Sequence, residues 1–190
     1  MILKSKIMKK VIITILSAFL LNSCTKDEIE SITSNPTPDA LPPATTVGAN
    51  KVGCLVNGVV FLPHQRNTFG SPVVTCFYQF VNNGHHFSLG FSNDQLTNIR
   101  GVNIASHNLE LQQGNTYQLV NDNGNSAFGS YYNFGDSQYF TTNIVTGELK
   151  ITKLDQVNAI ISGTFWFDGI NSNGIKTEVR EGRFDMEYTQ

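Results

Sequence analysis

The chain is poor in cysteine, in charged residues and in long apolar runs. Its 190 residues include 3 Cys and one Trp, and 15% of them are charged. Cys54 and Cys76 do not form a Cys-x-x-Cys motif, and two cysteines are too few for a zinc site built from cysteine ligands. No apolar run reaches the roughly 20 residues that a membrane-spanning helix needs. The sequence therefore argues against a cysteine-built zinc centre and against an ordinary transmembrane helix.

Sequence motifs of the common catalytic sites are also missing. The chain has no G-x-S-x-G, no phosphate-binding loop and no H-E-x-x-H. His85 and His86 are adjacent in an expected strand and should point to opposite faces, so they cannot easily share one ion. His64 and His107 have no acid or histidine near them at ligand spacing. We therefore expect no metal site and no cofactor, and an enzymatic role is the less favoured hypothesis.

Positive charge is scarce beyond the N-terminus. Removal of residues 1–23 would take four lysines from the 13 basic residues and none of the 15 acidic ones, which leaves a net charge of −6. Nucleic-acid affinity depends largely on Lys and Arg contacts to phosphates. The sequence therefore argues against nucleic acid and against anionic membrane surfaces as partners.

The N-terminal segment has the layout of a secretory signal. Four lysines precede an apolar stretch, Val11–Leu21, and Cys24 follows the small residue Ser23. A cysteine at the cut resembles a bacterial lipoprotein signal, in which the thiol receives fatty chains such as palmitate and becomes the new N-terminus. Two or more chains give stable membrane anchoring. We expect residues 1–23 to be removed and Cys24 to be the lipid anchor; the alternative is a cleaved signal without lipid.

A short charge cluster follows the expected anchor. Lys26, Asp27 and Glu28 resemble the export signal of surface lipoproteins in the Bacteroidota, a lysine and acidic residues close to the lipidated cysteine. This resemblance implies an outer membrane lipoprotein that faces the cell exterior. The alternatives are a solvated charge cluster in a flexible tail and a protein on the periplasmic face.

The remaining chain divides into a tether and one domain. Residues 24–50 are rich in Pro, Ser and Thr, a composition that favours extended conformations without a core. Residues 51–190 carry short runs of aromatic and β-branched residues between Gly, Asn and Asp clusters. Asn57-Gly58 and Asn83-Gly84 predict hairpin turns, because both central residues must reach positive φ.

These patterns predict an all-β domain. The expected strands are 52–56, 59–63, 73–81, 85–92, 99–106, 116–120, 127–132, 138–144, 148–154, 159–168 and 175–188. Many short antiparallel strands with regular turns indicate an antiparallel β-sandwich or, as the alternative, a β-barrel. The strands vary in length without an even repeat, which favours the sandwich.

The clearest alternation lies near the C-terminus. Ile161, Phe165 and Phe167 fall on one face of the expected strand, which we interpret as the core face. In the last strand, Phe184, Met186 and Tyr188 alternate with charged residues in the same way.

The two cysteines of the domain leave two alternatives open. In an oxidising compartment, Cys54 and Cys76 could form a disulfide, which would stabilise the fold by about 3 kcal/mol in the chain-entropy model. The other alternative is a pair of buried free thiols.

Several short motifs together resemble a known family. They are Leu41–Thr45, Gly53–Gly58, Ile161–Phe165 and Glu181–Asp185. The combination is similar to a family of small Bacteroidota lipoproteins with a domain of unknown function. The resemblance implies an all-β lipoprotein of the cell envelope and implies no catalytic residues.

Trp166 is the best candidate for ligand binding. It should lie on the face opposite the core set, with Thr164 and Asp168 beside it. An exposed Trp among polar groups can stack on a sugar ring or seat a residue of a partner protein. The alternative is that a second layer or a loop covers the ring.

The acids of the last two strands offer a second hypothesis. A glycosidase needs two carboxyl groups at a defined separation. The candidates alternate with basic residues as in a solvated strand face, and they are Asp168, Glu178, Glu181, Asp185 and Glu187. The sequence thus predicts a membrane-anchored binding module for a glycan or another envelope protein. The alternatives are a carboxylate-dependent hydrolase and a structural envelope protein without a small ligand.

Overall fold

The computed structural model describes residues 40–65, 72–95, 98–135 and 137–190, which belong to the compact unit Asp39–Gln190. These residues form eleven strands and no helix, so none of them lies in a helix that could cross a membrane. All eleven strands expected from the sequence are present. They are β1 (Lys51–Val56), β2 (Val59–Phe61), β3 (Val74–Val81), β4 (Gly84–Asn93), β5 (Arg100–Ser106), β6 (Thr116–Leu119), β7 (Ala127–Asn133), β8 (Ser137–Phe140), β9 (Gly147–Asp155), β10 (Ile160–Ile170) and β11 (Lys176–Glu187).

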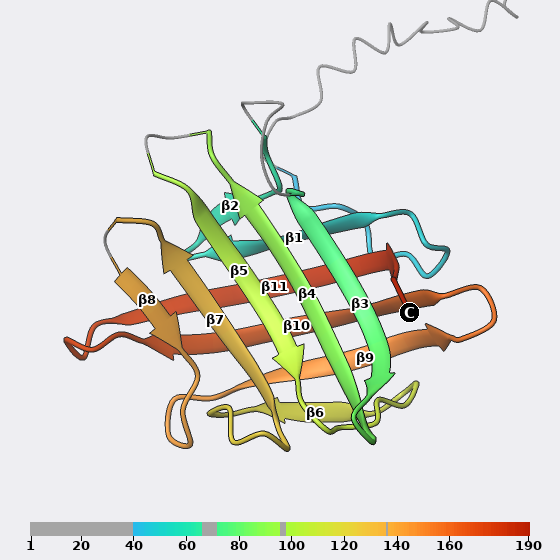
Figure 1. Cartoon of the computed structure of the whole chain (residues 1–190). Helices are drawn as coiled ribbons and strands as arrows, with labels where there is room; N and C mark the ends of the chain where they lie inside the picture. The colour runs from blue at the N-terminus through green and yellow to red at the C-terminus, as the bar shows by residue number, and fades with distance from the viewer. Residues whose placement is uncertain (1–39, 66–71, 96–97, 136) are drawn as a thin grey trace, which may run out of the picture. The chain divides into compact units, whose positions relative to one another are not determined.

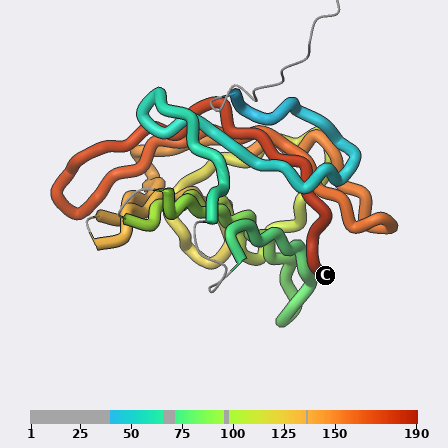
Figure 2. The backbone as a smooth tube through the Cα atoms, turned by 90° about the horizontal axis from the view of Figure 1, so that it is seen from above, coloured from blue at the N-terminus to red at the C-terminus, as the bar shows by residue number. Residues whose placement is uncertain are grey.

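The strands lie in two layers that cross each other (Figures 1 and 2). The back layer has the order β2-β1-β11-β10-β9-β6, and the front layer consists of β3, β4, β5, β7 and β8. The layers join where β6 and β7 pair in parallel, at Leu119 and Ala127. β8 pairs with both β7 and β10, which closes a ring of five strands, β10-β9-β6-β7-β8. The all-β prediction is confirmed, and the sandwich and the barrel each describe part of this fold.

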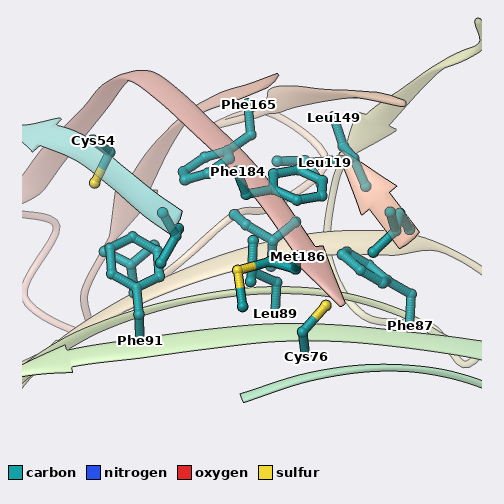
Figure 3. Close-up of a cluster of buried hydrophobic side chains, with 14 of the residues drawn as sticks. Cys54, Cys76, Phe87, Leu89, Phe91, Leu119, Leu149, Phe165, Phe184 and Met186 are labelled. Carbon is teal, nitrogen blue, oxygen red and sulfur yellow. The ribbon is translucent and has the colours of Figure 1, made fainter. Parts of the chain in front are cut away.

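Aromatic and aliphatic side chains from both layers fill the space between them (Figure 3). Phe184 of β11 lies between Phe87 of β4 and Phe165 of β10, with ring centroids 6.1 and 6.4 Å apart. Burial of such a side chain stabilises the fold by about 1.5–3 kcal/mol. The predicted core face is confirmed, because Phe165, Phe167 and Phe184 are all buried.

The two expected hairpin turns differ in their outcome. Asn57 and Gly58 have φ values of 50° and 79°, as the Asn-Gly prediction requires. In the second hairpin the central residues are Asn82 and Asn83, with φ of 52° and 64°, and Gly84 is the first residue of β4. The prediction was therefore wrong by one residue. Gly84 is needed for space, because a Cβ there would lie 1.9 Å from Oδ1 of Asn108.

A buried carboxylate fastens the segment before β1 to the back layer. Asp185 of β11 is only 1% exposed. It accepts hydrogen bonds from the hydroxyls of Thr45 (2.6 Å) and Ser162 (2.7 Å), and from the amides of residues 47–49 at 2.8 to 3.1 Å. Burial by itself raises the pKa of Asp185, but these hydrogen bonds outweigh it and hold the pKa well below its usual range.

This arrangement corrects one expectation from the sequence. Asp185 alternates with charged neighbours and was expected on a solvated strand face, which is wrong, because residues 45–49 cover it. The packing of the domain thus extends N-terminally of Lys51, into residues whose composition is typical of a tether.

Candidate functional site

Trp166 lies on the outer face of the back layer, in the middle of β10. Its side chain is 37% exposed, so no second layer covers it. The indole Nε1 donates to Oε2 of Glu148 on β9 at 3.3 Å. The guanidinium of Arg180, on β11, lies 5.5 Å from the ring centroid. Neighbours on both flanking strands therefore orient the ring.

A surface pocket of about 290 Å³ surrounds one side of this tryptophan. Two of the three predicted ligand-binding residues, Thr164 and Trp166, line it together. Its charged lining residues are Glu148, Lys150, Glu181 and Arg183. The third predicted residue, Asp168, is not part of the lining and pairs with Arg180 at 2.5 Å. Asp168 therefore positions the cation beside the ring.

The chemistry of this pocket suits a molecule with both apolar faces and hydroxyl groups. The indole offers an apolar surface for stacking. Carboxylates accept hydrogen bonds, and ammonium and guanidinium groups donate them. Sequence reasoning did not single out Glu148, because only the sheet register places it opposite Trp166.

The acids proposed for a hydrolase are mostly engaged in ion pairs. Asp168 and Glu178 face Arg180 at 2.5 and 3.6 Å, and Glu181 pairs with Arg183 at 3.1 Å. Asp185 is buried in the contact with residues 45–49. Glu181 shares the Trp166 pocket with Glu148, which was not among the candidates. Three of the five acids thus form ion pairs, whereas Asp185 is buried and Glu187 takes part in none of the ion pairs of the described residues.

Histidines acquire partners that the sequence did not indicate. Nδ1 of His107 lies 3.1 Å from Asp122, and Nδ1 of His64 lies 3.3 Å from Asp94. His85 and His86 point to opposite faces, as expected: His85 stacks on Tyr78, whereas the ring of His86 lies 5.5 Å from that of His107. Among the described residues, no group of three or more His, Cys, Asp or Glu could hold a metal ion.

Cys54 and Cys76 are buried free thiols, which is the second of the two alternatives (Figure 3). Burial raises the pKa of Cys54 and raises that of Cys76 to about 12, so both remain protonated at neutral pH. The expected anchor Cys24 and the residues Lys26, Asp27 and Glu28 lie outside the described residues.

Fold and surface define a single, mostly antiparallel β module of two crossed layers, with one tryptophan in an exposed pocket. Residues 83–186 match the family described as Domain of unknown function (DUF6252). This range covers more than half of the chain, so the protein belongs to the DUF6252 family. It includes the motifs Ile161–Phe165 and Glu181–Asp185 and begins after Gly53–Gly58. No curated protein and no solved structure matches the chain.

Proposed function

We propose that this protein is a lipid-anchored outer membrane protein of the cell surface whose β module binds a glycan. Cys24, after a basic and apolar leader, supports the anchor, and Lys26-Asp27-Glu28 supports display on the outside, as in Bacteroidota surface lipoproteins. The observation that carries the binding role is the exposed Trp166 in its pocket of charged and hydroxyl side chains.

A glycan fits this pocket better than a purely apolar or a highly charged ligand does. Sugar rings present C–H faces that stack on an indole and hydroxyls that pair with carboxylates and cations. The pocket combines both signs of charge, with Glu148 and Glu181 against Lys150 and Arg183. The two glutamates would repel a strongly anionic ligand, and Lys150 and Arg183 would repel a strongly cationic one.

The binding role is tested by Trp166→Ala on a glycan array. We expect the variant to lose at least tenfold in affinity for every glycan that the wild type binds through this pocket. Phe134→Ala is the matched control, because Phe134 is an aromatic residue that is 71% exposed and lies outside the pocket. Unchanged glycan binding in Trp166→Ala would contradict the proposal, and capture of an envelope protein through Trp166 would replace the glycan by a protein partner.

The anchor is tested independently. Cys24→Ser should move the protein from the membrane fraction to the soluble fraction, and mass spectrometry of the wild type should find fatty chains on an N-terminal cysteine. Labelling of intact cells should reach the wild type. An unmodified N-terminus would contradict the anchor, and labelling only after the outer membrane is opened would place the protein on the periplasmic face.

One observation favours a hydrolase as a second candidate: Glu148 and Glu181 line the same pocket as Trp166. Two carboxyl groups beside a bound sugar are the requirement for glycoside hydrolysis. Release of reducing ends from a bound glycan, abolished in both Glu148→Gln and Glu181→Gln, would support this candidate. Binding without product release would leave a binding module, and the absence of any ligand would favour a structural envelope protein.

A further inference from the structure

The outer face of the front layer contains a second recessed surface, which differs in chemistry from the Trp166 pocket. We call it the trough; its volume is about 430 Å³. Its lining has no Asp, Glu, Lys or Arg and combines aromatic, aliphatic, amide, hydroxyl and imidazole side chains. Those used below are Phe77, Ser88, Asn103, Phe128, His86 and His107.

The sheet register explains why this surface is recessed. One row of paired residues crosses four strands, with Phe77 opposite Ser88, Ser88 opposite Ala105, and Ala105 opposite Phe128. The two ends of the row are aromatic and its centre is small. Three strand spacings separate the two phenylalanine backbones, about 14 Å. The result is a floor of small residues between two aromatic walls.

Beside Ala105, the floor carries hydrogen-bonding groups. Ser88 Oγ donates to Oδ1 of Asn103 at 3.1 Å, which engages the oxygen end of that carboxamide. The amide nitrogen of Asn103 makes no hydrogen bond within the described part of the chain. Gly90 of β4 lies beside Asn103, and a Cβ there would be only 3.0 Å from Oγ1 of Thr75.

Two imidazole rings of the lining lie beside the floor, with His86 and His107 5.5 Å apart. Tyr132 packs closely over Gly101 and is not among the residues that line the trough.

We propose that the trough binds an uncharged polysaccharide chain, at a site separate from the Trp166 pocket. A lining without Asp, Glu, Lys or Arg offers little to compensate a charged ligand's loss of hydration. Flat aromatic walls suit the C–H faces of sugar rings, and the amide of Asn103 and the hydroxyl of Ser88 suit sugar hydroxyls. An extended peptide would seek free backbone groups at a sheet edge, whereas the floor strands β4 and β5 are paired on both sides.

Affinity electrophoresis of the detergent-solubilised full chain tests this proposal. Each gel contains one neutral polysaccharide: mannan, galactan, xylan, starch or hydroxyethyl cellulose. A further gel contains carboxymethyl cellulose, the anionic counterpart of hydroxyethyl cellulose. We expect at least one neutral polysaccharide to retard the protein. Asn103→Ala and Phe128→Ala should each weaken this retardation at least fivefold, whereas Trp166→Ala should leave it unchanged. Near-ultraviolet circular dichroism checks that each variant is folded.

The outcomes separate the trough from the Trp166 pocket. Weaker retardation of Asn103→Ala and Phe128→Ala, with Trp166→Ala unchanged, supports the inference, even if the Trp166 pocket binds nothing. Retardation that is lost only in Trp166→Ala, or that both trough variants retain, overturns it. A lack of retardation by every neutral polysaccharide also overturns it, and so does retardation by carboxymethyl cellulose alone.

Discussion

The front and back layers share one core but differ sharply in charge. The strands of the front layer contain a single Asp, Glu, Lys or Arg, which is Arg100, whereas those of the back layer contain 13. Their inner faces are alike, since Leu89 and Ile104 of the front layer are as completely buried as Leu149 and Ile151 of the back layer. The core therefore requires apolar side chains from both layers, but it places no such requirement on the two outer faces.

This difference divides the surface chemistry between the layers. On the back layer, charged residues form ion pairs around Trp166 and fasten residues 45–49 through Asp185. On the front layer, neutral polar and aromatic side chains surround the trough. We therefore expect ionic strength to affect the back layer far more than the front layer.

The largest expected effect tests that the inner faces are equivalent. The test uses a Cys24→Ser background, so that Cys54 of the back layer and Cys76 of the front layer are the two thiols present. Both are buried in the core, so in the native protein each should react with a thiol reagent at least about a thousandfold more slowly than in the protein unfolded by urea. Stopped-flow measurement with Ellman's reagent gives the two rates. One fast thiol in the native protein would show that its layer opens independently.

The next effect concerns the buried charge of the back layer. Asp185→Ala should lower the free energy of unfolding by about 2–4 kcal/mol, because it leaves the donors of Thr45, Ser162 and residues 47–49 without their acceptor. Urea denaturation measures the change. Glu178→Ala, an exposed acid of the same strand, should cost about 0.5 kcal/mol or less. Equal effects of the two substitutions would contradict the role assigned to Asp185.

The same carboxylate predicts an acid dependence. The pKa of Asp185 in the folded state lies below its unfolded value of about 3.9. As the pH falls, the unfolded state therefore binds more protons than the folded state does. The stabilisation that the ionised Asp185 gives the fold is complete above about pH 5 and is progressively lost below about pH 4. The stability difference between wild type and Asp185→Asn should shrink over this window in urea titrations. Asp155, with a pKa of about 2, titrates there in both proteins and cancels in the difference.

A smaller effect tests the packing of the front layer. Gly101→Ala should cost about 1–3 kcal/mol, because the new Cβ meets the ring of Tyr132. Ser130→Ala, on the outer face of the neighbouring strand, is the control and should change stability by about 0.5 kcal/mol or less. Adding Tyr132→Ala to Gly101→Ala should make the two costs less than additive in a double-mutant cycle. Strict additivity would show that the ring is not the obstacle.

The smallest effect concerns the exposed ion pairs. Arg180→Met should lower stability by about 0–1 kcal/mol, less at high salt, because Asp168 and Arg180 are partly exposed. Trp166 is the single tryptophan, so its fluorescence reports the loss of the cation beside the ring. Lys176→Met, on the same strand, should leave the emission unchanged. A salt-independent loss of several kcal/mol would show that this pair is effectively buried.

Much of the fold could be predicted because its signals are local. Alternation of period two identified β10 and placed Phe165 and Phe167 inside and Trp166 outside. Asn57-Gly58 identified the first turn, since few other residue pairs reach positive φ at both positions. The second turn was displaced by one residue because Asn82 and Asn83 also tolerate positive φ.

The candidate site was only partly predictable, because its members come from different strands. Thr164 and Trp166 share one strand face and were found together, but Glu148 joins them only through the pairing of β9 with β10. The pair of His107 with Asp122 depends in the same way on how a loop folds back.

By itself, the amino-acid sequence determined the all-β class, the eleven strands and the face of β10 that enters the core, because these follow from the spacing of neighbouring side chains. The tertiary structure alone decided the order of the strands, the burial of Asp185 beneath residues 45–49 and the assembly of the trough from four strands. These features depend on which distant segments meet, and a pattern that spans ten residues contains no information about that.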